Sequence, residues 1–279
     1  MVFLGMLGSI DCMHWRWRNC PAHWKGHYTR GDHGYPSIIL EAVASYDGWF
    51  WHAFFGTAGS NNDINVLNQF DLFSELLAGE APPCTYTVNG CTFAKGYYLA
   101  DAIYPEWSTI VKSFKNLIDP KQKKFKRYQE LARKDIERAF GILQGRWRIV
   151  QCPARPYYIH KIRRILLSYV ILNNMITEDN DRAFCGLEEN YRPVRRPPRS
   201  FQERVEAHMR VDAEIRDAGI HQLLKHMLVE HIHNLPPNYR IQHDPTRNPN
   251  NQDDARPSHI PDDEDEEDHK EDQEDDDEE

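Results

Sequence analysis

The chain has 279 residues, and its 40% hydrophobic and 28% charged side chains are ordinary for a globular protein that buries a core. Its net charge of −9 is unevenly spread, since residues 253–279 hold 17 acidic and two basic side chains while residues 1–252 carry +6. This distribution excludes an acidic folded domain and predicts a mildly basic one followed by an acidic tail.

Membrane and secretory classes are also excluded by the pattern of apolar residues. The longest apolar run, Ile165–Leu172, has eight residues, whereas a membrane-spanning helix needs roughly 20. The N-terminal apolar stretch lacks a basic segment before it, so no signal peptide is expected. The six cysteines form no CxxC pair, which predicts reduced thiols in an intracellular protein.

The first 55 residues predict three antiparallel strands. Apolar runs cover Leu4–Met13, Ser37–Ser45 and Trp49–Phe55. Asp47 and Gly48 separate the last two runs, and an Asp-Gly step is typical of a hairpin.

Helices dominate the remainder of the chain. Ile136, Phe140, Leu143 and Trp147 recur at helical spacing and predict a buried stripe. The expected elements are a helix from about Ser60 to Gly79, a strand over Gly96–Ala100, a helical stretch over Glu106–Leu117, and helices over Tyr128–Trp147, Lys161–Ile176 and Phe201–His233.

Three regions follow from this order. Residues 1–180 are predicted to form the main domain, residues 181–240 a basic linker with C-terminal helices, and residues 241–279 a disordered acidic tail.

Three acidic residues fall where a ribonuclease H-like nuclease would need them. Asp11 follows an apolar strand, and Asp101 follows the strand predicted over Gly96–Ala100. Glu137 lies on a helix face beside the buried stripe. Phosphodiester cleavage by two divalent cations requires carboxylates from separate rigid elements that meet in space. The element order β-β-β-α-β-α with these acids predicts an α/β fold, with an RNase H-like mixed sheet flanked by helices.

Several ordered segments resemble the plant members of the PIF/Harbinger transposase family. The resemblance runs from about Gly5 to Asp179, with a weaker echo around Ile215 to His231. The segments that carry it are Gly8–Trp15, Pro36–Ser45, Gly59–Leu67, Tyr97–Pro105 and Arg133–Gly141.

The resemblance implies a DDE-type DNA endonuclease domain in which Asp11, Asp101 and Glu137 bind Mg²⁺ or Mn²⁺. Asp63 lies in a family motif as a potential fourth ligand, although its place at a helix start equally suits a capping residue. The family reaction is hydrolysis at transposon ends, followed by transfer of the freed 3′-hydroxyl to target DNA.

The chain departs from the family pattern in two respects. It begins almost at the first catalytic strand, whereas full-length relatives carry an N-terminal DNA-binding module, so either the gene is truncated or this copy depends on a partner. The family is associated with a separate Myb/SANT-like protein that helps it reach DNA and the nucleus, so the resemblance implies such a partner and a nuclear location, or a cytoplasmic one without the partner. Ala102 replaces a glycine that relatives commonly place after the second Asp. If that position needs a positive φ, alanine would strain the turn that carries Asp101.

Basic side chains offer two regions for contact with DNA. The helix that carries Glu137 and the segment after it hold Arg133, Lys134, Arg138, Arg146 and Arg148, which are either phosphate contacts or a solvated face. The segment His14–Tyr35 interleaves basic and aromatic residues, which suits either nucleic-acid stacking or packing on its own domain.

Two function classes therefore remain. The first is a transposase-derived, divalent-metal-dependent DNA endonuclease. The second is a catalytically silent, host-retained protein that binds DNA or a Myb-like partner.

Overall fold

The computed structural model describes residues 2–32, 34–69, 71–78, 81–114, 119–180 and 201–236. All of these belong to one compact unit. Residues 181–200, predicted as a linker, and residues 241–279, predicted as a disordered tail, lie outside the described residues.

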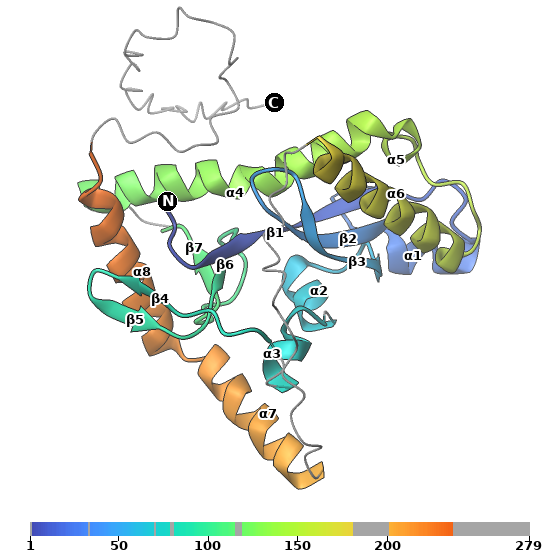
Figure 1. The fold of residues 1–279 in the computed structure, drawn as a ribbon. Helices are drawn as coiled ribbons and strands as arrows, with labels where there is room; N and C mark the ends of the chain where they lie inside the picture. Colours follow the sequence, from blue (N-terminus) through green and yellow to red (C-terminus); the bar gives the residue numbers. More distant parts are fainter. Residues whose placement is uncertain are drawn as a thin grey trace, which may run out of the picture. The chain divides into compact units, whose positions relative to one another are not determined.

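A five-stranded mixed sheet forms the centre of the fold (Figure 1). Its order is β3-β2-β1-β6-β7, in which β1, β2 and β3 are antiparallel neighbours and β6 and β7 run parallel to β1. A separate two-stranded sheet pairs β4 with β5. The strands are β1 (Met6–Arg16), β2 (Ser37–Ala44), β3 (Phe50–Ala58), β4 (Tyr86–Val88), β5 (Cys91–Phe93), β6 (Tyr97–Ala100) and β7 (Ile110–Lys112).

Helices flank this sheet. The longest, α4, begins after an Asp119 cap whose carboxylate accepts the backbone N–H of Lys121, with Pro120 at the first position. The helices are α1 (Lys25–Tyr28), α2 (Asp63–Gln69), α3 (Ser74–Ala78), α4 (Pro120–Arg146), α5 (Arg148–Gln151), α6 (Ile159–Asp179), α7 (Phe201–Ile215) and α8 (Ala218–His233), with 3₁₀ turns η1 (Ala22–Trp24) and η2 (Asp71–Phe73).

Alternation along β1 divides the core between the two faces of the sheet. Met13 and Trp15 point into a cluster with Phe140 and Leu143 of α4, whereas Ile10 packs on the opposite face. Asp11 shares the parity of Met13 and Trp15, so it faces α4. The α/β fold class, with a mixed RNase H-like sheet flanked by helices, is thus confirmed.

Three local predictions are corrected by the structure. The helical stretch predicted over Glu106–Leu117 is wrong, because the β-branched Ile110 and Val111 pair with β6 as the buried strand β7. Helix α4 starts at Pro120 rather than Tyr128, so the lysine-rich segment belongs to it. Strand β1 continues to Arg16, which places Asp11 inside the strand instead of at its end.

The predicted hairpin at Asp47-Gly48 joins β2 to β3, and Gly48 adopts the positive φ that this turn needs. A second hairpin, β4–β5, was not predicted, although Asn89-Gly90 at its turn is a strong hairpin signal. Helix α8 packs on the first half of α4 around Leu224, Leu228 and Phe125. Among the described residues, no helix has the length and apolar character needed to cross a membrane.

Candidate functional site

The register of two parallel strands brings Asp11 and Asp101 to neighbouring backbone positions. Ser9 of β1 pairs with Leu99 of β6. Asp11 lies two residues after Ser9, and Asp101 lies two residues after Leu99. Strand β6 ends at Ala100, so Asp101 leaves the sheet beside the point where Asp11 remains within β1. The Asp101 carboxylate accepts the backbone N–H of Ala102 at 2.7 Å, which fixes it in the turn after the strand.

Helix α4 brings Glu137 to this group through an arginine. One guanidinium nitrogen of Arg133, Nη1, lies 2.8 Å from Oε1 of Glu137 and 3.4 Å from Oδ2 of Asp11. The Ser9 hydroxyl, which donates to the Ala132 carbonyl at 3.0 Å, holds β1 against this part of α4. Glu137 therefore forms an i,i+4 ion pair with Arg133, and Arg133 bridges two of the predicted metal ligands.

Asp63 opens helix α2, where it was predicted as either a metal ligand or a cap. The adjacent residue supplies the cap, because Oδ1 of Asn62 accepts the backbone N–H of Asn65 at 2.8 Å. The Asp63 carboxylate is thus available for other contacts, and it is half-buried in the first turn of the helix.

Electrostatic coupling joins the four acids. Burial raises the pKa of Asp11 to about 6, against the lowering effect of the Cys12 N–H and Arg133, while Asp63 and Glu137 raise it further. Burial also raises the pKa of Asp63, to which Asp101 adds, and the Cys12 thiol and Arg30 oppose the shift. Each acid therefore lies within electrostatic range of at least one other.

A fifth acid, Glu41, was missed by sequence reasoning. It lies fully buried on β2 opposite Cys12, on the sheet face turned away from α4. The Tyr104 hydroxyl donates to its Oε1 at 3.5 Å and contacts the Cys12 thiol at 3.7 Å. Burial raises the pKa of Glu41 to about 8, and Asp63 and Asp11 add to this. The available signal was a lone charged residue in the middle of the apolar run that forms β2.

Ala102 does not strain the turn that carries Asp101. Among the described residues, Asn89 is the one non-glycine residue with a positive φ. The backbone at Ala102 thus accepts an alanine, and the concern raised by the missing glycine does not apply here.

The basic residues predicted for nucleic acid fall into two groups. Arg138 pairs with the buried Asp135 at 2.9 Å and donates to the Tyr46 carbonyl, and Arg146 donates to Oδ1 of Asn173 at 2.6 Å. Both guanidinium groups therefore connect α4 to neighbouring elements. Lys134 and Arg148 are exposed.

Most aromatic rings of the segment His14–Tyr35 pack on their own domain. Trp15, Trp17 and Tyr28 are buried in the core that α4 and α6 share with the sheet. Trp24 stays 39% exposed, and its ring lies 6.0 Å from that of Trp17.

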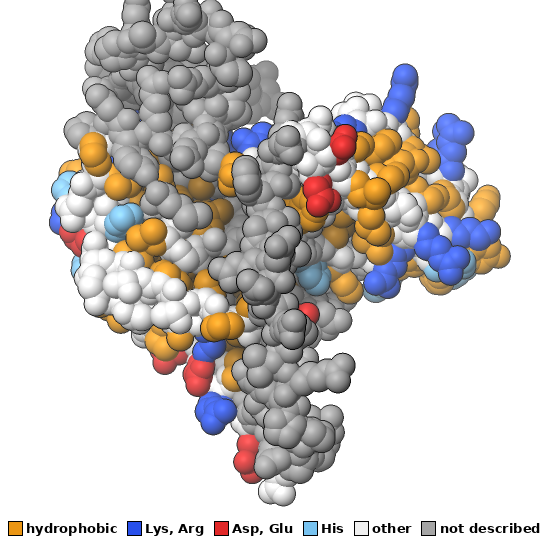
Figure 2. Space-filling view, viewed as in Figure 1, with side chains coloured by type: hydrophobic (Ala, Val, Ile, Leu, Met, Phe, Trp, Pro, Cys, Tyr) orange, Lys and Arg blue, Asp and Glu red, His pale blue; other side chains and the backbone are white. Residues whose placement is uncertain are grey.

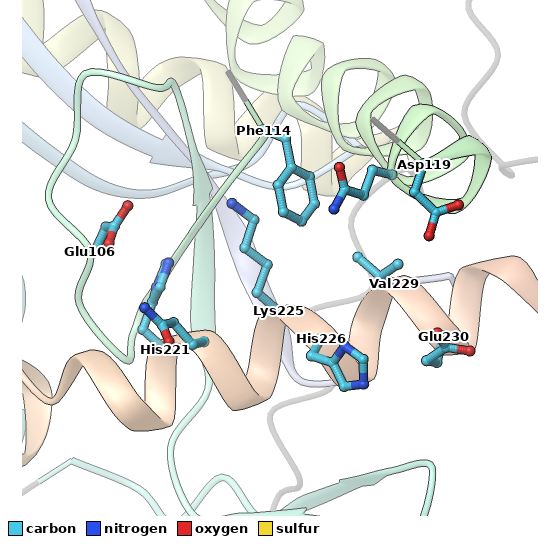
Figure 3. A pocket seen from close by; sticks show the side chains of 10 residues that line it. Glu106, Phe114, Asp119, His221, Lys225, His226, Val229 and Glu230 are labelled. Carbon is cyan, nitrogen blue, oxygen red and sulfur yellow. The ribbon is translucent and has the colours of Figure 1, made fainter. Parts of the chain in front are cut away.

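A cavity of about 370 Å³ lies between α8 and the start of α4 (Figure 3). Its lining includes Glu106, Phe114, His221 and Lys225, and the Lys225 ammonium lies 3.8 Å from the centre of the Phe114 ring. None of the four predicted ligands lines this cavity, so it is separate from the acidic group.

The chemistry of the acidic group suits a hard divalent cation. Carboxylate oxygens are the ligands that Mg²⁺ and Mn²⁺ prefer, and burial with repulsion from neighbouring acids makes Asp11 and Asp63 favour an added positive charge. In the described part of the chain, no three His, Cys, Asp or Glu side chains lie close enough to form a ready-made metal site. The positive charge between Asp11 and Glu137 is the Arg133 guanidinium.

The fold and this group define an α/β protein with an RNase H-like sheet and acids on β1, after β6 and on α4. The family model for plant transposon proteins matches residues 1–184, well over half of the chain, so the chain belongs to that family. Its origin is thus transposon-derived. A comparison with curated proteins and one with solved structures found no match.

Proposed function

We propose that this chain is a divalent-metal-dependent DNA endonuclease of the DDE type, derived from a PIF/Harbinger-like transposase. The observation that carries the proposal is the convergence of Asp11 and Glu137 on Arg133, with Asp101 following β6 beside them. Asp11 and Glu137 share one cation, and Asp101 couples to this group through Asp63. A two-metal nuclease needs carboxylates from separate rigid elements such as these, drawn together by its ions.

Asp11, Asp101 and Glu137, assisted by Asp63, would hold Mg²⁺ or Mn²⁺, which supplies a nucleophile at neutral pH and charge stabilisation for phosphodiester hydrolysis. The protein's own contribution is a rigid frame, since Asp11 lies within β1 and the Asp101 carboxylate is fixed by a backbone hydrogen bond. Once released from the carboxylates, Arg133 can donate to a phosphate oxygen, and the exposed Lys134 adds positive charge beside it.

The proposed setting is a nuclear one, with DNA as substrate and a Myb/SANT-like protein as partner. Strand transfer of the freed 3′-hydroxyl to target DNA is the second reaction that a transposase origin suggests. Hydrolysis and strand transfer would both use the same acidic group and the same DNA contacts.

The test is Mg²⁺ titration calorimetry on the full chain and on Asp101→Asn and Glu137→Gln. The 17 tail acids are the same in all three proteins, so their weak cation binding cancels in the comparison. We expect both variants to lose the tight phase of the parent and to lose nicking of supercoiled plasmid in Mg²⁺. Equal binding curves for the three proteins would rule out the metal site.

A catalytically silent DNA- or Myb-binding protein is the second candidate. It is favoured by the Arg133 guanidinium, which satisfies Asp11 and Glu137 without a metal. Plasmid nicking separates the two candidates, since the silent protein would bind DNA and leave it intact with or without Mg²⁺.

A further inference from the structure

Two segments of the chain hold basic residues with no acidic ones. Residues 14–30 contain four Arg or Lys, residues 138–177 contain seven, and neither contains Asp or Glu. Such a separation of charge in a protein with acids elsewhere indicates a surface for a polyanion.

Backbone pairing brings these two segments together. The Arg18 N–H donates to the Ala154 carbonyl at 2.9 Å, and the Ala154 N–H donates to the Arg16 carbonyl at 2.8 Å. The Asn19 side chain donates to the Arg155 carbonyl at 2.6 Å. The end of β1 and the loop between α5 and α6 therefore form one continuous edge.

Buried tryptophans hold this edge rigid. Nε1 of Trp15 donates to the Cys152 carbonyl and Nε1 of Trp17 to the Pro156 carbonyl, each at 2.8 Å. Both rings lie in the core, so the loop that they anchor is fixed from below.

The same loop leaves two large aromatic side chains in solvent. Tyr157 is 63% exposed and Tyr158 is 60% exposed, and the Lys161 ammonium lies 5.4 Å from the centre of the Tyr158 ring. Adjacent exposed tyrosines among basic residues are typical of contacts to sugars and bases rather than of a solvated loop. Figure 2 shows Lys and Arg side chains on the end of this face that carries α1, α5 and α6, next to apolar ones.

We propose that Arg16, Arg18, Arg155, Tyr157, Tyr158 and Lys161 form a basic–aromatic surface that binds the DNA flanking the cleaved phosphate. Arg16 lies five residues beyond Asp11 on β1, a separation of roughly 17 Å at about 3.3 Å per strand residue. At about 3.4 Å per nucleotide of one strand, this surface contacts DNA about five base pairs from the acidic group. Only this placement rests on the proposed function; binding of DNA to the surface does not.

The experiment measures binding of a fluorescein-labelled 30-base-pair duplex to the full chain by fluorescence polarisation, in EDTA, at a series of salt concentrations. The charge variant is Arg155→Gln with Lys161→Gln, and the aromatic variant is Tyr157→Ser with Tyr158→Ser. The matched control is Lys123→Gln with Arg127→Gln, which removes two exposed positive charges from α4.

We expect the charge variant to bind at least fivefold more weakly and to lower the slope of log affinity against log salt by about two, one for each lost phosphate contact. The aromatic variant should weaken binding about fivefold with an unchanged slope, because stacking is not a counterion effect. The control should stay within twofold of the parent.

Equal weakening by the control and the charge variant would overturn the proposal, since net charge alone would then explain binding. Parent-like affinity of both surface variants would overturn it as well. EDTA removes divalent metal and so prevents cleavage. The binding results can therefore be interpreted even if the nuclease proposal fails.

Discussion

Acids on the two sides of the central sheet are compensated in different ways. Toward α4, Asp11 and Glu137 share the Arg133 guanidinium at 3.4 and 2.8 Å. On the opposite face, Glu41 is fully buried, and its Oε2 has no hydrogen-bond partner in the described part of the chain. The first group is balanced by a cation, whereas Glu41 keeps its proton because burial raises its pKa to about 8.

At the first site a bound cation can replace the arginine, whereas at Glu41 no cation can bind in this way. An arginine at the edge of a cluster can swing away when another cation arrives, and the two carboxylates remain ionised. A buried carboxyl that is neutral at pH 7 offers no charge to a cation, and ionising it would leave an uncompensated charge in the core. The carboxylates that can take a metal ion in place of Arg133 therefore lie on the α4 side of the sheet.

The largest expected effect comes from Glu41→Gln. A carboxyl whose folded pKa is raised binds more protons in the folded state, so wild-type stability falls as pH rises from about 4.5 toward 8. Shifted from 4.5 to about 8, Glu41 makes the free energy of unfolding on the order of 3 kcal/mol smaller at pH 8 than at pH 5. Glu41→Gln should remove most of that loss, as measured by urea unfolding at both pH values.

The control for this change is Glu130→Gln, which removes an acid from a half-buried position on α4 where it pairs with Lys126 at 3.7 Å. It should leave the pH dependence of stability close to that of the parent. If Glu41→Gln kept the full wild-type loss between pH 5 and pH 8, Glu41 would not be the proton-bearing group.

The two faces also differed in how well the sequence predicted them. The α4 side was predicted because Ile136, Phe140 and Leu143 recur at helical spacing and fix which face of α4 is buried. Asp11, Asp101 and Glu137 could be chosen because motif spacing and element ends are visible in sequence. Their distances could not be predicted, since they depend on the register of Ser9 with Leu99, a contact between segments 90 residues apart.

Strand β7 and the burial of Glu41 were less predictable, each for a physical reason. Strand β7 is three residues long, and a run that short has no periodicity that distinguishes it from part of a helix. The partners of Glu41 come from β1 and from the loop after β6, so burial of its carboxyl appears only in three dimensions. Arg133 was likewise visible as an i,i+4 partner of Glu137, but its contact with Asp11 required the packing of α4 on β1.

Arg133→Gln sharpens the comparison from the α4 side. Without the guanidinium, Asp11 and Glu137 repel each other, so the metal-free protein should lose about 1 kcal/mol of stability, a modest value because Glu137 is 44% exposed. The freed acids should bind Mg²⁺ several-fold more tightly, since no ion pair has to be broken first. Urea unfolding in EDTA and Mg²⁺ calorimetry measure the two effects.

Lys126→Gln is the matched control, because it removes another i,i+4 cation from α4 at a distance from the acids. It should change neither Mg²⁺ affinity nor stability by a measurable amount. Weaker Mg²⁺ binding by Arg133→Gln would contradict the replacement of Arg133 by a metal ion. It would mean instead that Arg133 stabilises the metal-bound protein.

Ala102→Gly has the smallest expected effect, and it tests the turn after β6 that carries Asp101. Ala102 follows Asp101 and has no positive φ, so glycine relieves no strain and only adds freedom to the unfolded chain. The substitution should therefore cost about 0.5 kcal/mol of stability. Mg²⁺ affinity should change by less than twofold, because the Asp101 carboxylate still accepts the backbone N–H of residue 102. Tenfold tighter binding in calorimetry would contradict this expectation. It would mean that the turn after β6 adopts, in the metal-bound protein, a conformation that alanine opposes, so that metal binding requires this turn to rearrange.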